Sequence, residues 1–197
     1  MKIMGDDRIK KGIIGLALLG VVVFALFLIF GNPFAEDKKV SWEGKTDGYE
    51  SADEMEKNVN IIVKGEKLSE DETIVFDSEV TNDPAGGYTK SSFKISEVIK
   101  NSEDDGAISV GNTINISEAE FYDKNSKTTY TINDYENMKQ GKDYVLYLKQ
   151  ADEGLYTTAG VTFGKIPING DKTELEESDV NEQVNEVINE AQQEFSE

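Results

Sequence analysis

The chain has 197 residues with a formal net charge of −19, and it contains neither cysteine nor histidine. The missing cysteine excludes disulfides, thiolate metal sites and cysteine nucleophiles, and the missing histidine removes the commonest general base and transition-metal ligand. The length suits one domain with an appendage, and the negative charge would repel phosphate backbones, so we expect no nucleic-acid partner.

An apolar segment near the N-terminus is the strongest signal in the chain. Residues 13–30 read IIGLALLGVVVFALFLIF without a charge, and as a helix they would span about 27 Å, close to the thickness of a bilayer core. A cleavable signal peptide is the alternative, but it has a shorter apolar region and small residues before its cleavage site. Pro33 occupies such a position if cleavage followed Ala35. We therefore predict an uncleaved transmembrane anchor over residues 13–30.

The flanking charges indicate the orientation of this anchor. Four basic residues precede it and three follow it: Lys2, Arg8, Lys10 and Lys11, then Lys38, Lys39 and Lys45. Because basic residues favour the cytoplasmic side, this distribution favours a cytoplasmic N-terminus. The acidic remainder would also lie poorly against an anionic cytoplasmic leaflet. We predict a single-pass cell-membrane protein with a cytoplasmic tail over residues 1–12 and an extracytoplasmic C-terminal domain.

A tether and then a β-rich domain are predicted after the anchor. Residues 31–49 are polar and show no apolar period, which predicts a tether. Ser51 and Glu54 form a capping box at the start of a short helix. Within residues 50–170, short apolar runs with turn signals between them lie at 59–63, 73–76, 93–99, 108–116, 130–132 and 144–148. This pattern predicts a small antiparallel barrel or sandwich.

The segment 144–168 predicts a central hairpin of this domain. Residues 144–148 (YVLYL) are apolar on both faces, as expected of a central strand. An acidic turn at 151–154 precedes a second strand, in which Gly160 and Gly164 mark a bulge or a close backbone approach. We expect this hairpin to close the barrel, with Tyr156 and Phe163 on its inner side.

Residues 171–197 predict an acidic linker followed by an amphipathic helix. The apolar stripe of this helix comprises Val180, Val184, Val187, Ile188, Ala191 and Phe195, with Ser178 and Asp179 placed to cap it. We expect the stripe to pack on the barrel. The alternative is a helix that binds a partner or another copy of the chain.

Candidate chemistry is sparse. One loop resembles the start of an EF-hand through Asn101, Glu103, Asp105 and Gly106, but Asn112 stands where a bidentate carboxylate is required. A hairpin turn is the better interpretation, and a loose Ca²⁺ contact through Glu103, Asp104 or Asp105 is the alternative. Some aromatic residues could line a ligand face, although such residues more often form core and cross-strand pairs: Tyr88, Phe121, Tyr122, Tyr130, Tyr135, Tyr144, Tyr147 and Tyr156.

Motifs for nucleophilic catalysis or phosphate binding are missing from the sequence. Carboxylates are so abundant that no two can be singled out as a hydrolytic pair. We therefore assign no catalytic, cofactor-binding or metal-ligating residue, and we expect neither a cofactor nor an enzymatic activity.

The order of five short motifs carries a resemblance to a known class of domains. The motifs are NIIVKGE (60–66), FKISEVIKN (93–101), VGNTINI (110–116), QGKDYVLYLK (140–149) and GVTFGKIPI (160–168). Their order resembles small extracytoplasmic domains of membrane-anchored proteins in Gram-positive bacteria and, more remotely, the netrin-like domain of metalloproteinase inhibitors. The resemblance implies an OB-like barrel with five or six strands. Those inhibitors act through an N-terminal cysteine, which this chain lacks.

Two functions remain open at this point. The first is a membrane-anchored extracytoplasmic binding or interaction module, whose partner is a protein or a polymer of the cell envelope. The second is a hydrolase, or a direct regulator of an exported enzyme, that uses carboxylates. Three or more carboxylates in one pocket would favour the second function, and scattered carboxylates would favour the first.

Overall fold

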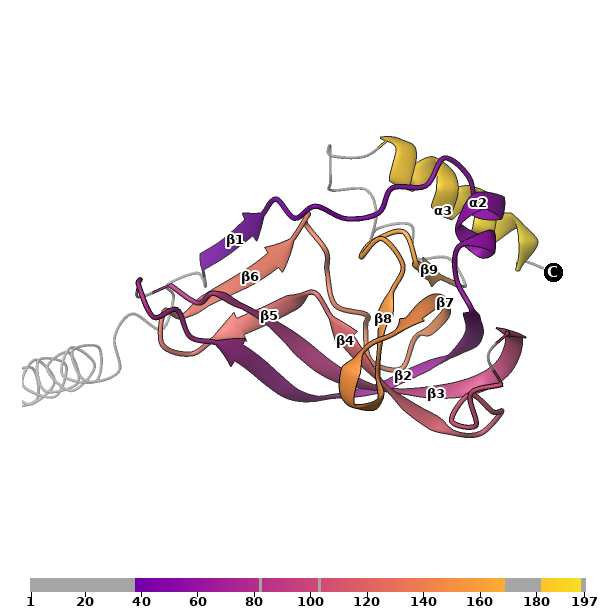
Figure 1. Ribbon diagram of the computed structural model, residues 1–197, viewed down its shortest axis with the longest axis horizontal. Helices are drawn as coiled ribbons and strands as arrows, with labels where there is room; N and C mark the ends of the chain where they lie inside the picture. The colour runs from indigo at the N-terminus through magenta and orange to yellow at the C-terminus, as the bar shows by residue number, and fades with distance from the viewer. Residues whose placement is uncertain (1–37, 82, 103, 169–181, 196–197) are drawn as a thin grey trace, which may run out of the picture. The chain divides into compact units, whose positions relative to one another are not determined.

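Two long paired strands organise the fold. The computed structural model describes residues 38–81, 83–102, 104–168 and 182–195. Its elements in chain order are β1 (Lys38–Trp42), α2 (Ala52–Lys57), β2 (Ile61–Phe76), β3 (Gly86–Asn101), β4 (Thr113–Glu118), β5 (Glu120–Asp123), β6 (Thr128–Ile132), β7 (Asp143–Gln150), β8 (Leu155–Thr158), β9 (Lys165–Pro167) and α3 (Glu182–Glu194). Figure 1 shows the β2–β3 pair running beneath the shorter strands. The predicted mainly β class is confirmed.

A six-stranded sheet, ordered β2-β3-β4-β8-β7-β9, nearly closes on itself. Its strands are antiparallel except for β4 and β8, which pair in parallel. The first part of β2, from Ile61 to Glu66, also pairs with β7. Because β2 meets β3 on one side and β7 on the other, the five strands β2, β3, β4, β8 and β7 enclose an apolar interior.

The predicted central strand, residues 144–148, is confirmed. In β7, Tyr144, Leu146 and Leu148 join the interior cluster, whereas Val145 and Tyr147 join a second cluster on the outer face. The same alternation places Ile61 and Val63 of β2 inside and Ile62 outside. Strands that are buried on both faces therefore separate two hydrophobic cores.

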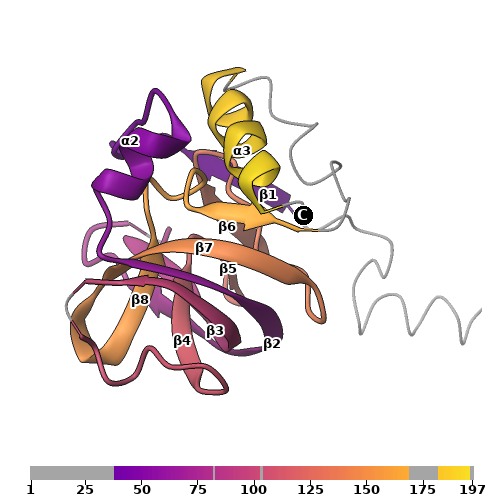
Figure 2. The same cartoon turned by 90° about the vertical axis from the view of Figure 1, so that its right-hand side faces the viewer.

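The outer core lies between the barrel and the two helices. Val184, Val187, Ile188 and Ala191 of α3 are buried in it, together with Met55 of α2. Figure 2 shows both helices on the same side of the barrel, beyond β7. The predicted packing of the C-terminal apolar stripe is confirmed. The expected caps of this helix lie outside the described residues.

The second strand of the predicted hairpin is interrupted. β8 and β9 both pair with β7, and the chain leaves β7 between Thr158 and Lys165. Gly160 lies in this excursion at φ 57°, and a Cβ on Gly164 would come within 2.6 Å of the Tyr147 carbonyl oxygen. Tyr156 points into the interior core as expected. The expectation for Phe163 is wrong, because the excursion carries its side chain into the outer core against Tyr49.

Part of the predicted tether is folded. Lys38–Trp42 forms β1, which pairs in parallel with β6 in a three-stranded sheet ordered β1-β6-β5. Its aromatic residues pack together, since the Trp42 ring lies 4.8 Å from that of Tyr130 and 5.9 Å from that of Phe121. Tyr49 is also buried. The local polarity that predicted a tether is overcome by pairing with a strand distant in the sequence.

The predicted cytoplasmic tail (1–12), the transmembrane anchor (13–30) and the first part of the tether lie outside the described residues. Within the part of the chain that the structure describes, no helix is both long and apolar enough to cross a bilayer. The predicted short helix begins as expected, because the Ser51 hydroxyl accepts a hydrogen bond from the Glu54 amide at 3.1 Å.

Candidate functional site

A buried ion pair lies at one end of the barrel interior. Lys67 continues the inward alternation of β2, and Glu118 continues that of β4. The Lys67 ammonium lies 2.8 Å from the Glu118 carboxylate, and both side chains are fully buried. Two charges removed from water require hydrogen bonds to all of their polar atoms.

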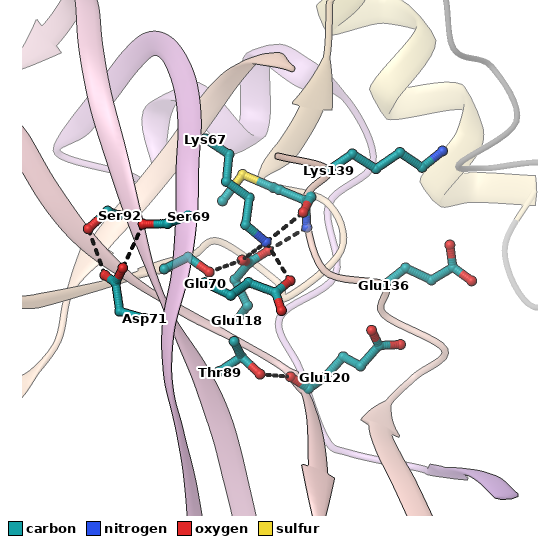
Figure 3. Close-up of polar contacts among 12 residues, drawn as sticks. Lys67, Ser69, Glu70, Asp71, Thr89, Ser92, Glu118, Glu120, Glu136 and Lys139 are labelled. Carbon is teal, nitrogen blue, oxygen red and sulfur yellow. Dashed lines mark hydrogen bonds and ion pairs between the residues drawn. The ribbon is translucent and has the colours of Figure 1, made fainter. Parts of the chain in front are cut away.

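Those hydrogen bonds are present. The Lys67 ammonium also donates to the Met138 carbonyl oxygen at 2.5 Å and to the Glu70 carboxylate at 2.9 Å. Glu118 accepts from the Ser91 hydroxyl, from the Tyr135 hydroxyl at 3.1 Å and from the Met138 amide at 2.5 Å. Figure 3 shows the Lys67 ammonium directed at the Glu118 and Glu70 carboxylates. The pair therefore holds the segment between β6 and β7 against the end of the barrel.

A second buried lysine supports the same segment. The Lys165 ammonium lies 4.6 Å from the centre of the Tyr135 ring and donates to the Glu136 carbonyl oxygen at 2.5 Å. Burial, and then the nearby Glu118 carboxylate, raise the pKa of the Tyr135 hydroxyl well above its usual value. Tyr135 therefore acts as a neutral hydrogen-bond donor to Glu118.

Glu70 connects this buried network to the surface. Its carboxylate binds Lys67, although the Glu70 side chain itself is half exposed. The neighbouring Asp71 accepts hydrogen bonds from the Ser69 and Ser92 hydroxyls, both at 2.6 Å, and these bonds lower its pKa. Figure 3 shows Asp71 held between the two serines.

Glu70 and Asp71 line a groove of about 720 Å³. One wall comes from β2 and the other from the end of β5 and the turn after it. The lining residues are Glu70, Asp71, Glu72, Thr73, Val75, Tyr122, Asp123, Lys124 and Asn125. Asp123 accepts hydrogen bonds from the Asn125 amide at 2.9 Å and the Ser126 amide at 3.1 Å. The pKa of Asp123 is lowered, most strongly by a hydrogen bond from the Ser126 side chain and then by that from the Asn125 backbone. Because Asp123 is almost fully buried, its carboxylate fixes the shape of this turn opposite β2.

The β2 wall of the groove includes the outer edge of that strand. Pairing with β7 ends at Glu66, and the bonds between Lys67 and residues 141 and 142 end the contact on that side. From Leu68 to Val75, the described backbone hydrogen bonds of β2 go to β3 alone. Here the strand is also irregular, with register shifts between Lys67 and Ser69 and between Glu70 and Glu72.

The loop that resembled an EF-hand connects two antiparallel strands as a hairpin, which is the interpretation that the sequence favoured. It joins β3 and β4, which are antiparallel. The Asn101 side chain bonds the backbone of Asp105, and the Asp105 carboxylate accepts the Ala107 amide at 2.9 Å and the Tyr156 hydroxyl at 2.5 Å. Glu103 lies outside the described residues. Asp105 thus serves the internal packing of the turn.

The aromatic residues that were candidates for a ligand face are mostly core. Tyr122 is the candidate that lines the groove among the described residues. Tyr88 is half-buried and packs against the exposed Phe76 ring. The buried ones are Phe121, Tyr130, Tyr135, Tyr144, Tyr147 and Tyr156.

Sequence reasoning missed Lys67 and Glu118. The signal was present, because Lys67 follows Ile61, Val63 and Gly65 at the same even spacing, and none of those earlier inward positions carries a polar side chain. A charge at such a position needs a buried partner. That partner lies on another strand, so the spacing alone could not identify it.

Several carboxylates lie along one groove, an outcome that the sequence alone left open. Four of them line the groove: Glu70, Asp71, Glu72 and Asp123. No group of three acidic side chains within the described ranges is arranged to hold a metal ion. No protein-family model and no curated protein matches the chain.

Proposed function

We propose that the protein is a membrane-anchored extracytoplasmic binding module that holds its partner in the groove between β2 and the β5–β6 turn. The observation that carries this proposal is the groove itself. Its walls are fixed, because Glu70 is bound to buried Lys67 and Asp123 is bound to its own turn. A preformed groove on a rigid sheet is typical of a binding site.

The fold supports this proposal as an OB-like barrel. OB folds are small, partly open barrels whose surfaces and loops bind extended polymers. Here five strands form the nearly closed series, and β4 pairs in parallel with β8.

The uncharged run of residues 13–30 supports the anchor, and the basic residues before it support an extracytoplasmic groove. Protease added outside intact protoplasts tests this part of the proposal. Digestion of the domain that follows residue 37 is expected. Its protection until the membrane is permeabilised would contradict the localisation.

A hydrolase is the alternative, and the four carboxylates of the groove are the observation that favours it. A hydrolytic pair needs one carboxyl group that stays protonated. Hydrogen bonds instead lower the pKa of both Asp71 and Asp123, which favours their ionised forms. Glu118 is closed off by four donors inside the barrel. These features favour binding over catalysis.

Photo-crosslinking in living cells tests the binding site. A photoreactive amino acid would replace Thr73 in the groove or, as a matched control, Ser96, an exposed residue on β3. We expect a discrete adduct of one mass from position 73, which the control does not give. Equal adducts from both positions, or none from position 73, would contradict a partner in the groove.

A further inference from the structure

We propose, resting on the function above, that the groove binds an extended basic peptide segment, which adds as a strand to the outer edge of β2 between Leu68 and Val75. Strand addition to an exposed sheet edge is a recurring mode of peptide recognition, in which main-chain bonds provide affinity and side chains provide selectivity. The partner is therefore a protein with an exposed, lysine- or arginine-rich extended segment.

The free edge is the first step of the argument. Over residues 68–75, β2 bonds to β3 on one side, and the described backbone makes no hydrogen bond on the other side. An edge strand in this state presents a row of unpaired amides and carbonyls. These groups are the ones that an added strand would satisfy.

The groove opens on this edge. Glu70, Asp71, Glu72 and Thr73 are consecutive, and all of them line it. Successive residues of a strand point to opposite faces, so one groove can touch all four only where it meets the strand edge or its bulge. Six residues of β2, from 70 to 75, would accommodate a partner strand of about 20 Å.

Charge selects the partner. The β2 wall contributes Glu70, Asp71 and Glu72, and the opposite wall contributes Lys124 beside the almost fully buried Asp123. Edge-to-edge pairing of two copies would bring the three β2 carboxylates of each copy together, and an acidic peptide would meet the same repulsion. Charges and bulges on an edge strand prevent unselective pairing. A basic strand is the one that this edge accepts.

Side-chain contacts are available beside the free edge. Val75 and half-buried Tyr122 lie in the lining, so alternate apolar residues or lysine stems of the added strand would have surfaces to pack on. Thr73 is exposed there as well. The groove thus combines main-chain, ionic and apolar contacts.

Peptide binding to the full-length chain provides the test. The probe is a fluorescent decapeptide of alternating lysine and threonine, and binding is followed by anisotropy at physiological salt. Three comparison probes separate the contributions: alternating glutamate and threonine, the lysine peptide with alternate amides N-methylated, and spermine, which is polycationic but has no peptide backbone. We expect the lysine peptide to bind, N-methylation to weaken it at least tenfold, and spermine to compete poorly.

Two variants locate the binding. Glu70→Gln with Glu72→Gln should weaken the lysine peptide several-fold, whereas Glu97→Gln with Glu79→Gln removes the same charge from exposed positions outside the groove lining and should not. Equal binding of the N-methylated peptide would overturn strand addition. If the lysine peptide does not bind, the proposal that the partner is a basic extended peptide is wrong. The proposed binding function is tested separately, because a crosslinked adduct from position 73 in cells would still support it.

Discussion

The Lys67 ammonium lies 2.8 Å from the Glu118 carboxylate, inside a barrel whose other inward residues are mainly apolar. The pair joins β2 to β4 and, through Met138, fixes the segment before β7. It also holds Glu70 at the groove. The same buried contact therefore sets the barrel end and one wall of the candidate site.

Removing one member of this pair should destabilise the fold strongly. Lys67→Met leaves the Glu118 carboxylate buried without a cation and should cost about 3–5 kcal/mol, whereas Glu118→Gln leaves Lys67 its contact with half-exposed Glu70 and should cost less. Lys67→Met with Glu118→Leu should cost less than the sum of the two single changes, because no charge is left unpaired. Denaturant unfolding measures all three, with Glu97→Gln as an exposed control. Additive losses would contradict the coupling.

Leu146→Ala should destabilise the protein by about 2–5 kcal/mol, because it would leave a cavity in the interior core. Leu146 is fully buried, and its strand is paired on both sides. Thermal or denaturant melts measure this loss. A change below about 1 kcal/mol would mean that the site collapses around the smaller side chain.

Gly164→Ala should weaken the fold by about 1–3 kcal/mol. The added Cβ would lie 2.5 Å from the Ala159 amide nitrogen and 2.6 Å from the Tyr147 carbonyl oxygen, so the backbone would have to move. Gly106→Ala is the matched control, because nothing lies within 4 Å of its added Cβ. Equal melting temperatures for the two variants would disagree with this packing.

Stability should fall at alkaline pH through Tyr156. Burial, and then the hydrogen bond to Asp105, raise the pKa of Tyr156 to about 12 in the folded state, whereas an unfolded tyrosine titrates near pH 10. Its contribution is therefore complete below about pH 10 and is lost as the pH rises through about 12. Tyr156→Phe should flatten this part of the pH profile of the unfolding free energy. An unchanged slope would contradict the effect.

Local patterns predicted much of the fold because the responsible interactions are local or periodic. Strand β7 is apolar on both faces and helix α3 has one apolar stripe, and each pattern indicates which faces of its element are buried. β1 could not be predicted in this way, since KKVSW becomes a strand only by pairing with β6, far along the chain. The prediction for Phe163 was wrong for a related reason. The alternation of inward and outward side chains ends where the chain leaves β7 after Thr158.

The candidate site was less predictable than the fold. Glu70, Asp71 and Glu72 form an ordinary acidic run in the sequence. They become a groove wall only because β7 stops pairing with β2 at Glu66 and the turn containing Asp123 lies opposite. Both facts are consequences of tertiary structure, and a single sequence does not contain them as a pattern.

Hydrogen exchange of the β2 amides tests the central claim most directly. The full-length chain would be measured alone and with the alternating lysine–threonine decapeptide. Strand addition predicts that outward-facing amides between residues 68 and 75 become protected, while the amides of α3 exchange at an unchanged rate. Binding of the peptide without protection of these β2 amides would show that the groove is not a site of strand addition.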